Sequence, residues 1–167
     1  TGALLMQQVQ AGKLKVTDKL SKFYPKVKGA SHITIRQMLD MTSGLSESRW
    51  PKKVLSETGF VKYVTKHAIY TPVQAGHFDY QPVNFVILVG IIKKLSGQSY
   101  YQLFNSNIVQ KFNLKHTGFV TAAQQIPNGA VGYGGKNNRN YQRPNTFTQL
   151  DIANQLGIGD VYMSTGD

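Results

Sequence analysis

The side chain with the clearest potential for chemistry is the phenol of Tyr80, which stands just ahead of an uninterrupted apolar run, Phe85 to Ile92. Pro82 lies between them and suits the first turn of a helix, where its missing N–H would have no partner in any case. The field at a helix N-terminus favours negative charge. A tyrosine in this position can therefore accept a proton, or it can be an ordinary packing residue.

The apolar run itself is predicted to be a buried helix from about Pro82 to Leu95. Periodicity alone does not separate a buried helix from a buried strand, but the C-terminal end favours a helix. Lys93 and Lys94 suit a helix C-terminus, and Gly97 is placed to close it. Because the run is apolar on all sides, other parts of the protein must pack against several sides of the helix. The residues expected to be largely buried are Phe85, Ile87, Leu88, Ile91 and Ile92.

Other catalytic groups are scarce along the chain. The 167 residues include no cysteine and only two glutamates, so thiolate chemistry is excluded and a glycosidase-type carboxylate pair is not expected. The four histidines have no metal-site spacing, and no G-x-S-x-G or phosphate-binding glycine loop occurs. Ser43 and Ser46 could be nucleophiles in principle, although no base is near them in the sequence. We therefore predict no metal and no cofactor.

The charge of the chain favours anionic partners, since 19 lysines and arginines outnumber 8 acidic residues and give a formal charge of +11. Nucleic acid is not the predicted partner, because the basic residues are scattered and neither zinc-finger spacing nor an RNP-type motif is present. A solvated basic surface, or attraction to an anionic cell wall or membrane face, fits better. No apolar run is long enough to span a bilayer.

The remaining elements are predicted to be mostly helices. Two capping boxes, Thr34 with Gln37 and Ser99 with Gln102, mark helix starts. The expected helical ranges are 1–10, 33–44, 55–67, 99–107 and 148–156, and the turn residues Gly12 and Gly44 can end the first two. The first range has no start signal, so the chain is expected to begin inside a helix. After Pro127 a glycine- and asparagine-rich stretch is expected, with a short strand at Val131 and Tyr133.

Several stretches together resemble the serine β-lactamase and D,D-peptidase (penicillin-binding protein) superfamily, in its class C-like branch. ITIRQMLDMTSGL (33–45) is similar to the segment after the first catalytic helix, and FDYQPVNFVILVGIIKKLSGQSYYQLF (78–104) to the second catalytic motif and its helix. NIVQKFNLKHTGF (107–119) and GDVYMSTGD (159–167) resemble two later segments of that branch. The resemblance covers nearly the whole chain in order.

The resemblance implies an α+β parent fold of which residues 1–167 form a partial domain, mainly the helical region with little sheet. It also implies a serine and a lysine in S-x-x-K, a tyrosine in Y-x-N and a late K/H-x-G strand. Only the tyrosine, Tyr80, lies in this chain. The serine and lysine are expected before Thr1 and the strand beyond Asp167, so the chain alone is expected to be inactive.

Two residues depart from the family's pattern. Pro82 stands where the family usually has asparagine, and Val89 stands where the helix usually has glycine. Proline has no side-chain amide, so the usual contact with a substrate amide is lost at this position. Asn84, or the N–H groups at the start of the helix, could bind the substrate instead. The two departures therefore argue against classical β-lactamase activity more than against membership of the hydrolases.

The predicted function is a segment of an exported serine hydrolase that acts through an acyl-enzyme on D-Ala-type peptides, β-lactams or small esters. Tyr80 would relay the proton. The alternative is a non-catalytic relative that binds an anionic cell-wall polymer. Either way the resemblance places the protein outside a bacterial cell or on its surface.

Overall fold

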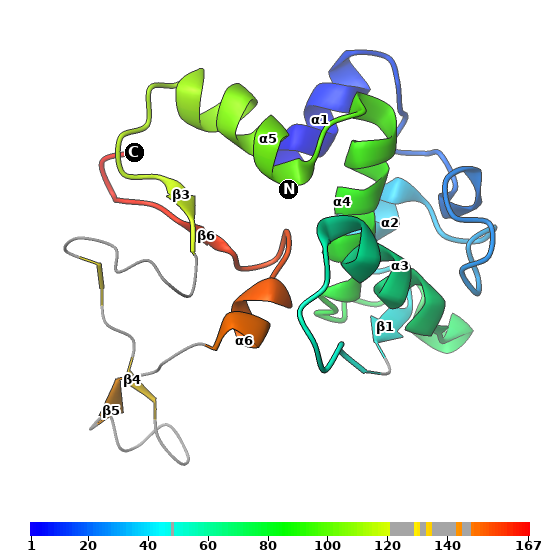
Figure 1. Ribbon diagram of the computed structural model, residues 1–167. Coiled ribbons are helices and arrows are strands. Elements are labelled where there is room, and N and C mark those ends of the chain that lie inside the picture. The colour runs from blue at the N-terminus through cyan, green and yellow to red at the C-terminus, as the bar shows by residue number, and fades with distance from the viewer. Residues whose placement is uncertain (48, 121–128, 131–132, 135–142, 145–147) are drawn as a thin grey trace.

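The chain folds around one central helix, α4 (Val83–Ser96), in a computed structural model that describes residues 1–47, 49–120, 129–130, 133–134, 143–144 and 148–167. Helices α1 (Gly2–Gln10), α2 (Ile35–Leu39), α3 (Glu57–His67) and α5 (Tyr100–Phe104) all contact α4. Figure 1 shows α4 (green) in the middle of this helical part, with α1, α2 and α3 around it. No described helix is long and apolar enough to cross a membrane.

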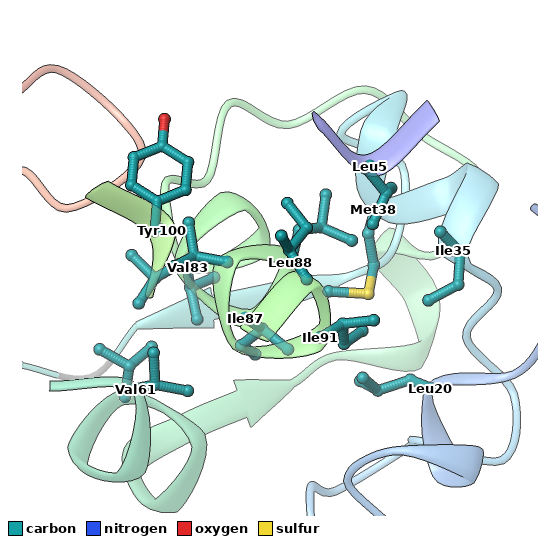
Figure 2. Close-up of a cluster of buried hydrophobic side chains, with 14 of the residues drawn as sticks. Leu5, Leu20, Ile35, Met38, Val61, Val83, Ile87, Leu88, Ile91 and Tyr100 are labelled. Carbon is teal, nitrogen blue, oxygen red and sulfur yellow. The ribbon is translucent and has the colours of Figure 1, made fainter. Parts of the chain in front are cut away.

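The core forms on α4 because its apolar residues point in every direction and each side meets a different neighbour. Val83, Ile87, Leu88 and Ile91 are fully buried. Figure 2 shows them surrounded by side chains from the other elements, with Leu5 of α1, Ile35 and Met38 of α2, Val61 of α3, Tyr100 of α5 and Leu20 of the connector, residues 11–34 between α1 and α2. The predicted buried helix is confirmed, except that Phe85 is only partly buried.

The ends of α4 explain why the helix occupies this range. Pro82 is the N-cap and already has helical dihedrals, φ −55° and ψ −27°. Gly97 closes the helix in the left-handed conformation with φ 72°, which glycine adopts without a steric cost. Lys93 and Lys94 lie in the last turn, where positive charge is favourable.

The departure at Val89 is accommodated by a glycine far along the chain. Val89 is fully buried, and the backbone of Gly157 lies directly against it. A Cβ atom on Gly157 would overlap a methyl group of Val89, and Gly157 also has a positive φ of 73°. The added volume at position 89 therefore fits because position 157 has no side chain.

Side-chain caps fix the starts of four further helices. Thr34 and Gln37 form the predicted capping box of α2, and Ser99 and Gln102 form that of α5. Ser56 caps α3. Thr148 and Asp151 form a third capping box at α6 (Gln149–Ala153), inside the range predicted as a short helix.

Two predicted helices differ in length from the sequence-based ranges. The helix expected over 33–44 ends at Leu39, because Met41 with φ 55° and Gly44 with φ 74° turn the backbone into the left-handed region. The α5 helix continues as a π-helical segment, Asn105–Gln110, so the helical stretch extends past the predicted end at 107.

The described sheet structure is limited to three antiparallel pairs. These are β1 (Leu45–Glu47) with β2 (Ala68–Tyr70), β3 (Gly118–Phe119) with β6 (Val161–Tyr162), and β4 (Tyr133–Gly134) with β5 (Arg143–Pro144). Tyr133 lies in a strand as predicted, whereas Val131 lies outside the described residues. The chain is therefore mostly helical with little sheet, as predicted.

Candidate active site around Tyr80

The loop that precedes α4 presents Tyr80 to solvent. Residues 72–74 and 76–80 are exposed, and the side chain of Tyr80 is 65% exposed, next to Phe78 at 73%. Only Gln81 and the N-cap Pro82 separate Tyr80 from α4. An aromatic side chain that is this exposed does not pack into the core of this chain. Its hydroxyl is accessible at the N-terminal end of the central helix.

Backbone hydrogen bonds hold the loop against the turn that follows α2. The N–H of Asp79 donates to the carbonyl of Met41 at 2.9 Å, and the N–H of Gly76 donates to the carbonyl of Thr42 at 2.8 Å. Met41 has a positive φ of 55°, which is uncommon and costly for a residue with a side chain. The strained turn directs its carbonyl at Asp79, one residue before Tyr80, and so helps to position the tyrosine.

Asn84 does not face solvent; its side chain holds the loop before α4 in place. It is 1% exposed, and its Oδ1 accepts a 2.6 Å hydrogen bond from the Ser43 hydroxyl. Its Nδ2 donates to the carbonyl of Gln81 at 3.0 Å. Its oxygen and one amide hydrogen thus join the turn after α2, the loop and α4. The substrate contact predicted for Asn84 stays a prediction, and it would require these hydrogen bonds to rearrange.

The two serines near this site differ in their surroundings. Ser43 is buried, donates to Asn84 and accepts a 3.0 Å hydrogen bond from the N–H of Leu45. A hydroxyl held in this way by an amide oxygen has no base to activate it. Ser46 is partly exposed within β1. This arrangement gives Ser43 none of the features of an activated nucleophile.

Pro82 offers no side-chain amide at position 82, at the N-terminus of α4. Its carbonyl accepts the N–H of Phe85 at 3.0 Å, as expected for the first turn of a helix. The end of α4 close to Tyr80 is the positive end of the helix dipole, which stabilises negative charge. The site can therefore favour an anionic group of a substrate. Among the described residues, no cluster of three or more histidines and carboxylates could hold a metal ion.

The hydrogen bond between Ser43 and Asn84 was not foreseen from the sequence. A signal for it was present, because Asn84 is the polar residue in the first turn of an otherwise apolar helix. A buried amide at such a position needs a partner. The sequence did not reveal which partner, since Ser43 lies 41 residues earlier in the chain.

The sequence of the chain is similar to those of curated proteins along its full length. It is 28% identical to the Bacillus subtilis protein described as "Putative penicillin-binding protein PbpX", over 98% of this chain and 40% of that protein. It is 27% identical to a teichoic acid D-alanine hydrolase of Staphylococcus aureus, over 100% of this chain and 41% of that protein. The chain thus spans about two-fifths of the length of the curated relatives it matches.

Solved structures share the fold. FmtA from Staphylococcus aureus superposes with a TM-score of 0.78 at 24% identity, over 99% of this chain and 45% of that one. A class C β-lactamase from Rhodobacter sphaeroides superposes with a TM-score of 0.68 at 20% identity, over 99% of this chain and 44% of that one. The family model described as Beta-lactamase matches residues 1–167. The chain therefore belongs to the β-lactamase family and carries part of its fold.

Proposed function

We propose that this chain is part of an extracellular bacterial serine hydrolase in which Tyr80 relays a proton during acyl transfer. The observation that carries the proposal is the placement of Tyr80, exposed at the N-terminus of the buried helix α4 in the stretch that resembles the family's second catalytic motif. In this role the phenol, or its ionised form, exchanges a proton with the nucleophilic serine and then with the leaving group. The serine and lysine are expected in the segment before Thr1.

The proposed substrates are D-alanine-type acyl donors, with esters preferred over peptide-like amides and β-lactams. Membership of the family and the similarity to a teichoic acid D-alanine hydrolase support this class. Pro82 supports the ranking, because position 82 cannot donate an amide hydrogen bond to a peptide-like substrate. An ester has no such amide and depends less on that contact.

The test is the acylation of the full-length protein by a fluorescent penicillin and its turnover of a D-alanyl ester. Tyr80→Phe removes only the hydroxyl, so we expect both rates to fall by about 10²–10⁴-fold with no change in melting temperature. Tyr63→Phe on α3 is the matched control, since it also removes one phenol hydroxyl, which donates a long 3.5 Å hydrogen bond to the carbonyl of Trp50 and not to the loop before α4. If Tyr80→Phe reacts as fast as the wild type, the proposed role is wrong.

The substrate preference attributed to Pro82 can be tested separately. Pro82→Asn restores the side chain that the family usually has, and we expect penicillin acylation to rise by about tenfold, the value of one well-placed hydrogen bond. Turnover of the ester should change less. An equal change for both substrates would show that Pro82 does not set the preference.

A non-catalytic relative that binds an anionic cell-wall polymer is the second candidate, and the formal charge of +11 favours it. Loss of the upstream S-x-x-K serine separates the two. In the hydrolase, that change abolishes labelling and turnover, whereas a binding protein has neither activity to lose.

A further inference from the structure

A groove of about 740 Å³ lies at the other end of α4, away from Tyr80. It is formed by the last turns of α4, by α3 and by the connector residues 23–27. Ten residues of α4 separate Val83 at the helix start from Lys93 in the groove, a rise of about 15 Å. The groove is thus separate from the proposed active site, and its volume lies in the range typical of small-molecule sites.

The floor of the groove is apolar and closely packed. Tyr24 from the connector and Val61 from α3 both contact Gly90 of α4, where a Cβ atom would overlap each of them. Burial raises the pKa of Tyr24 to about 12, so its phenol stays neutral. The hydroxyl of Tyr24 lies against the backbone of Gly90.

Lysines surround this floor. Lys26, Lys62 and Lys66 line the groove with exposed side chains. Two more lysines are already engaged, since Lys93 lies 3.2 Å from Glu57 and Lys94 lies 4.6 Å above the ring of Tyr24. The described residues that line the groove include no carboxylate. An apolar floor with an uncompensated cationic rim complements a molecule with an apolar body and an anionic head.

We propose that this groove binds a single-chain lipid with a phosphate head group. The alkyl chain lies on Tyr24 and Val61, and the phosphate is held by Lys26, Lys62 and Lys66. A polar polyanion would use the lysines but leave the apolar floor exposed to water. The inference goes beyond the proposed hydrolase and does not depend on it.

The first test is calorimetric titration of the full-length protein with hexyl, octyl and decyl phosphate, each below its critical micelle concentration. If the chain enters the groove, affinity rises by about two- to fourfold for each added methylene. Equal affinities for all three, or binding only to vesicles of anionic lipid, would overturn the proposal in favour of a phosphate site or a membrane-facing surface.

The second test removes the rim charges. In the triple variant Lys26→Gln, Lys62→Gln and Lys66→Gln, we expect decyl phosphate to bind at least about tenfold more weakly, because charged hydrogen bonds to the phosphate are lost. The matched control changes Lys52, Lys111 and Lys115 to Gln, which removes the same charge from exposed positions elsewhere. Equal losses in the two variants would show that only net charge matters and would overturn the site.

The third test fills the floor without changing charge. Thr65 is partly buried in the groove wall on α3, and Thr65→Trp places an indole where the chain would lie. We expect the dependence on chain length to flatten while the melting temperature stays within the range of the other variants. An unchanged dependence on chain length would place the alkyl chain elsewhere and contradict the proposal.

Discussion

Helix α4 and the loop just before it both contain large apolar side chains, but those of α4 are buried and those of the loop are exposed. In α4 the residues from Val86 to Ile92 are fully buried, whereas in the loop Val73, Phe78 and Tyr80 are among the most exposed apolar side chains of the described residues. Burial of apolar area drives folding, so the packing of the other core residues on α4 stabilises this part of the protein. Apolar groups that the chain itself leaves exposed are available for contact with a substrate or with the rest of the protein. Helix α4 therefore serves folding, and the loop before it is available for function.

The sharpest way to break this comparison is to truncate one side chain from each region. Leu88→Ala removes a fully buried side chain from α4 and should lower the free energy of unfolding by about 2–5 kcal/mol. Phe78→Ala removes a larger side chain from the loop and should change it by no more than about 0.5 kcal/mol. Denaturant titration measures both. A large loss for Phe78→Ala would mean that the loop is part of the folding core.

The hydrogen bond between Ser43 and Asn84 joins the two regions and allows the comparison to be sharpened. Asn84→Ala leaves the buried Ser43 hydroxyl without its acceptor, so we expect a loss of about 1–3 kcal/mol. Ser43→Ala leaves the Asn84 oxygen unpaired at a similar cost. In the double variant both groups are gone, and the total loss should be smaller than the sum of the two single losses.

The Asn84 and Ser43 variants also test the positioning of Tyr80, because Asn84 holds the carbonyl of Gln81, the residue next to Tyr80. If Asn84 acts only as a brace, Asn84→Ala should slow ester turnover more than Ser43→Ala, because only the first change also removes the hydrogen bond to Gln81, and neither change should raise KM. If Asn84 also contacts the substrate, as the sequence-based prediction has it, Asn84→Ala should in addition raise KM, whereas Ser43→Ala should not. Kinetics of both variants in the full-length protein distinguish the two roles.

The sequence predicted the local features of this fold better than the distant contacts. Pro82, Gly97 and the uniform apolarity between them were sufficient to predict α4, since each acts within its own turn of helix. The capping boxes at Thr34 and Ser99 were predictable for the same reason. The early end of α2 was not, because the left-handed backbone at Met41 is stabilised by a hydrogen bond to Asp79, a residue 38 positions away.

The candidate site shows the same limit. Tyr80 was identified from its place before the helix and from the resemblance to the family. The burial of Asn84 was not predicted, because it depends on Ser43 and on the loop that covers it. The contact between Val89 and Gly157 was not predicted either. The two positions are 68 residues apart, and local sequence patterns do not indicate that the missing side chain at one makes room for the larger side chain at the other.

A buried charge next to α4 extends the comparison from apolar groups to a carboxylate. Asp160 follows Gly157, the residue that packs on Val89, and is 3% exposed. Burial raises the pKa of Asp160 from 3.8 to about 6. A folded-state pKa above the unfolded value means that folding takes up a proton. Stability from this group is therefore fully present below about pH 4 and is lost as the pH rises to about 6.

Asp160→Asn should remove this dependence. The variant keeps an oxygen that can accept the N–H of Gly157, which lies 3.3 Å from Asp160 Oδ1. We expect the variant to gain on the order of 2 kcal/mol relative to the wild type between pH 4.5 and 7.5, from a shift of about two pKa units. Thermal unfolding across that range measures the difference. A constant difference would show that Asp160 does not titrate there.

The smallest expected effect is that of the Thr34 cap. It shows whether a capping residue adds stability to α2, a helix that already packs on α4. Thr34 caps α2, accepting a 3.2 Å hydrogen bond from the N–H of Gln37, while Ile35 and Met38 of the same helix are fully buried against the core. If capping and packing act independently, Thr34→Ala costs about 1 kcal/mol, less than the truncation at Leu88. Thr34→Ser keeps the hydroxyl and should recover most of the loss. No loss in Thr34→Ala would mean that packing on α4 alone fixes the start of α2, and equal losses in both variants would trace the effect to the threonine methyl group.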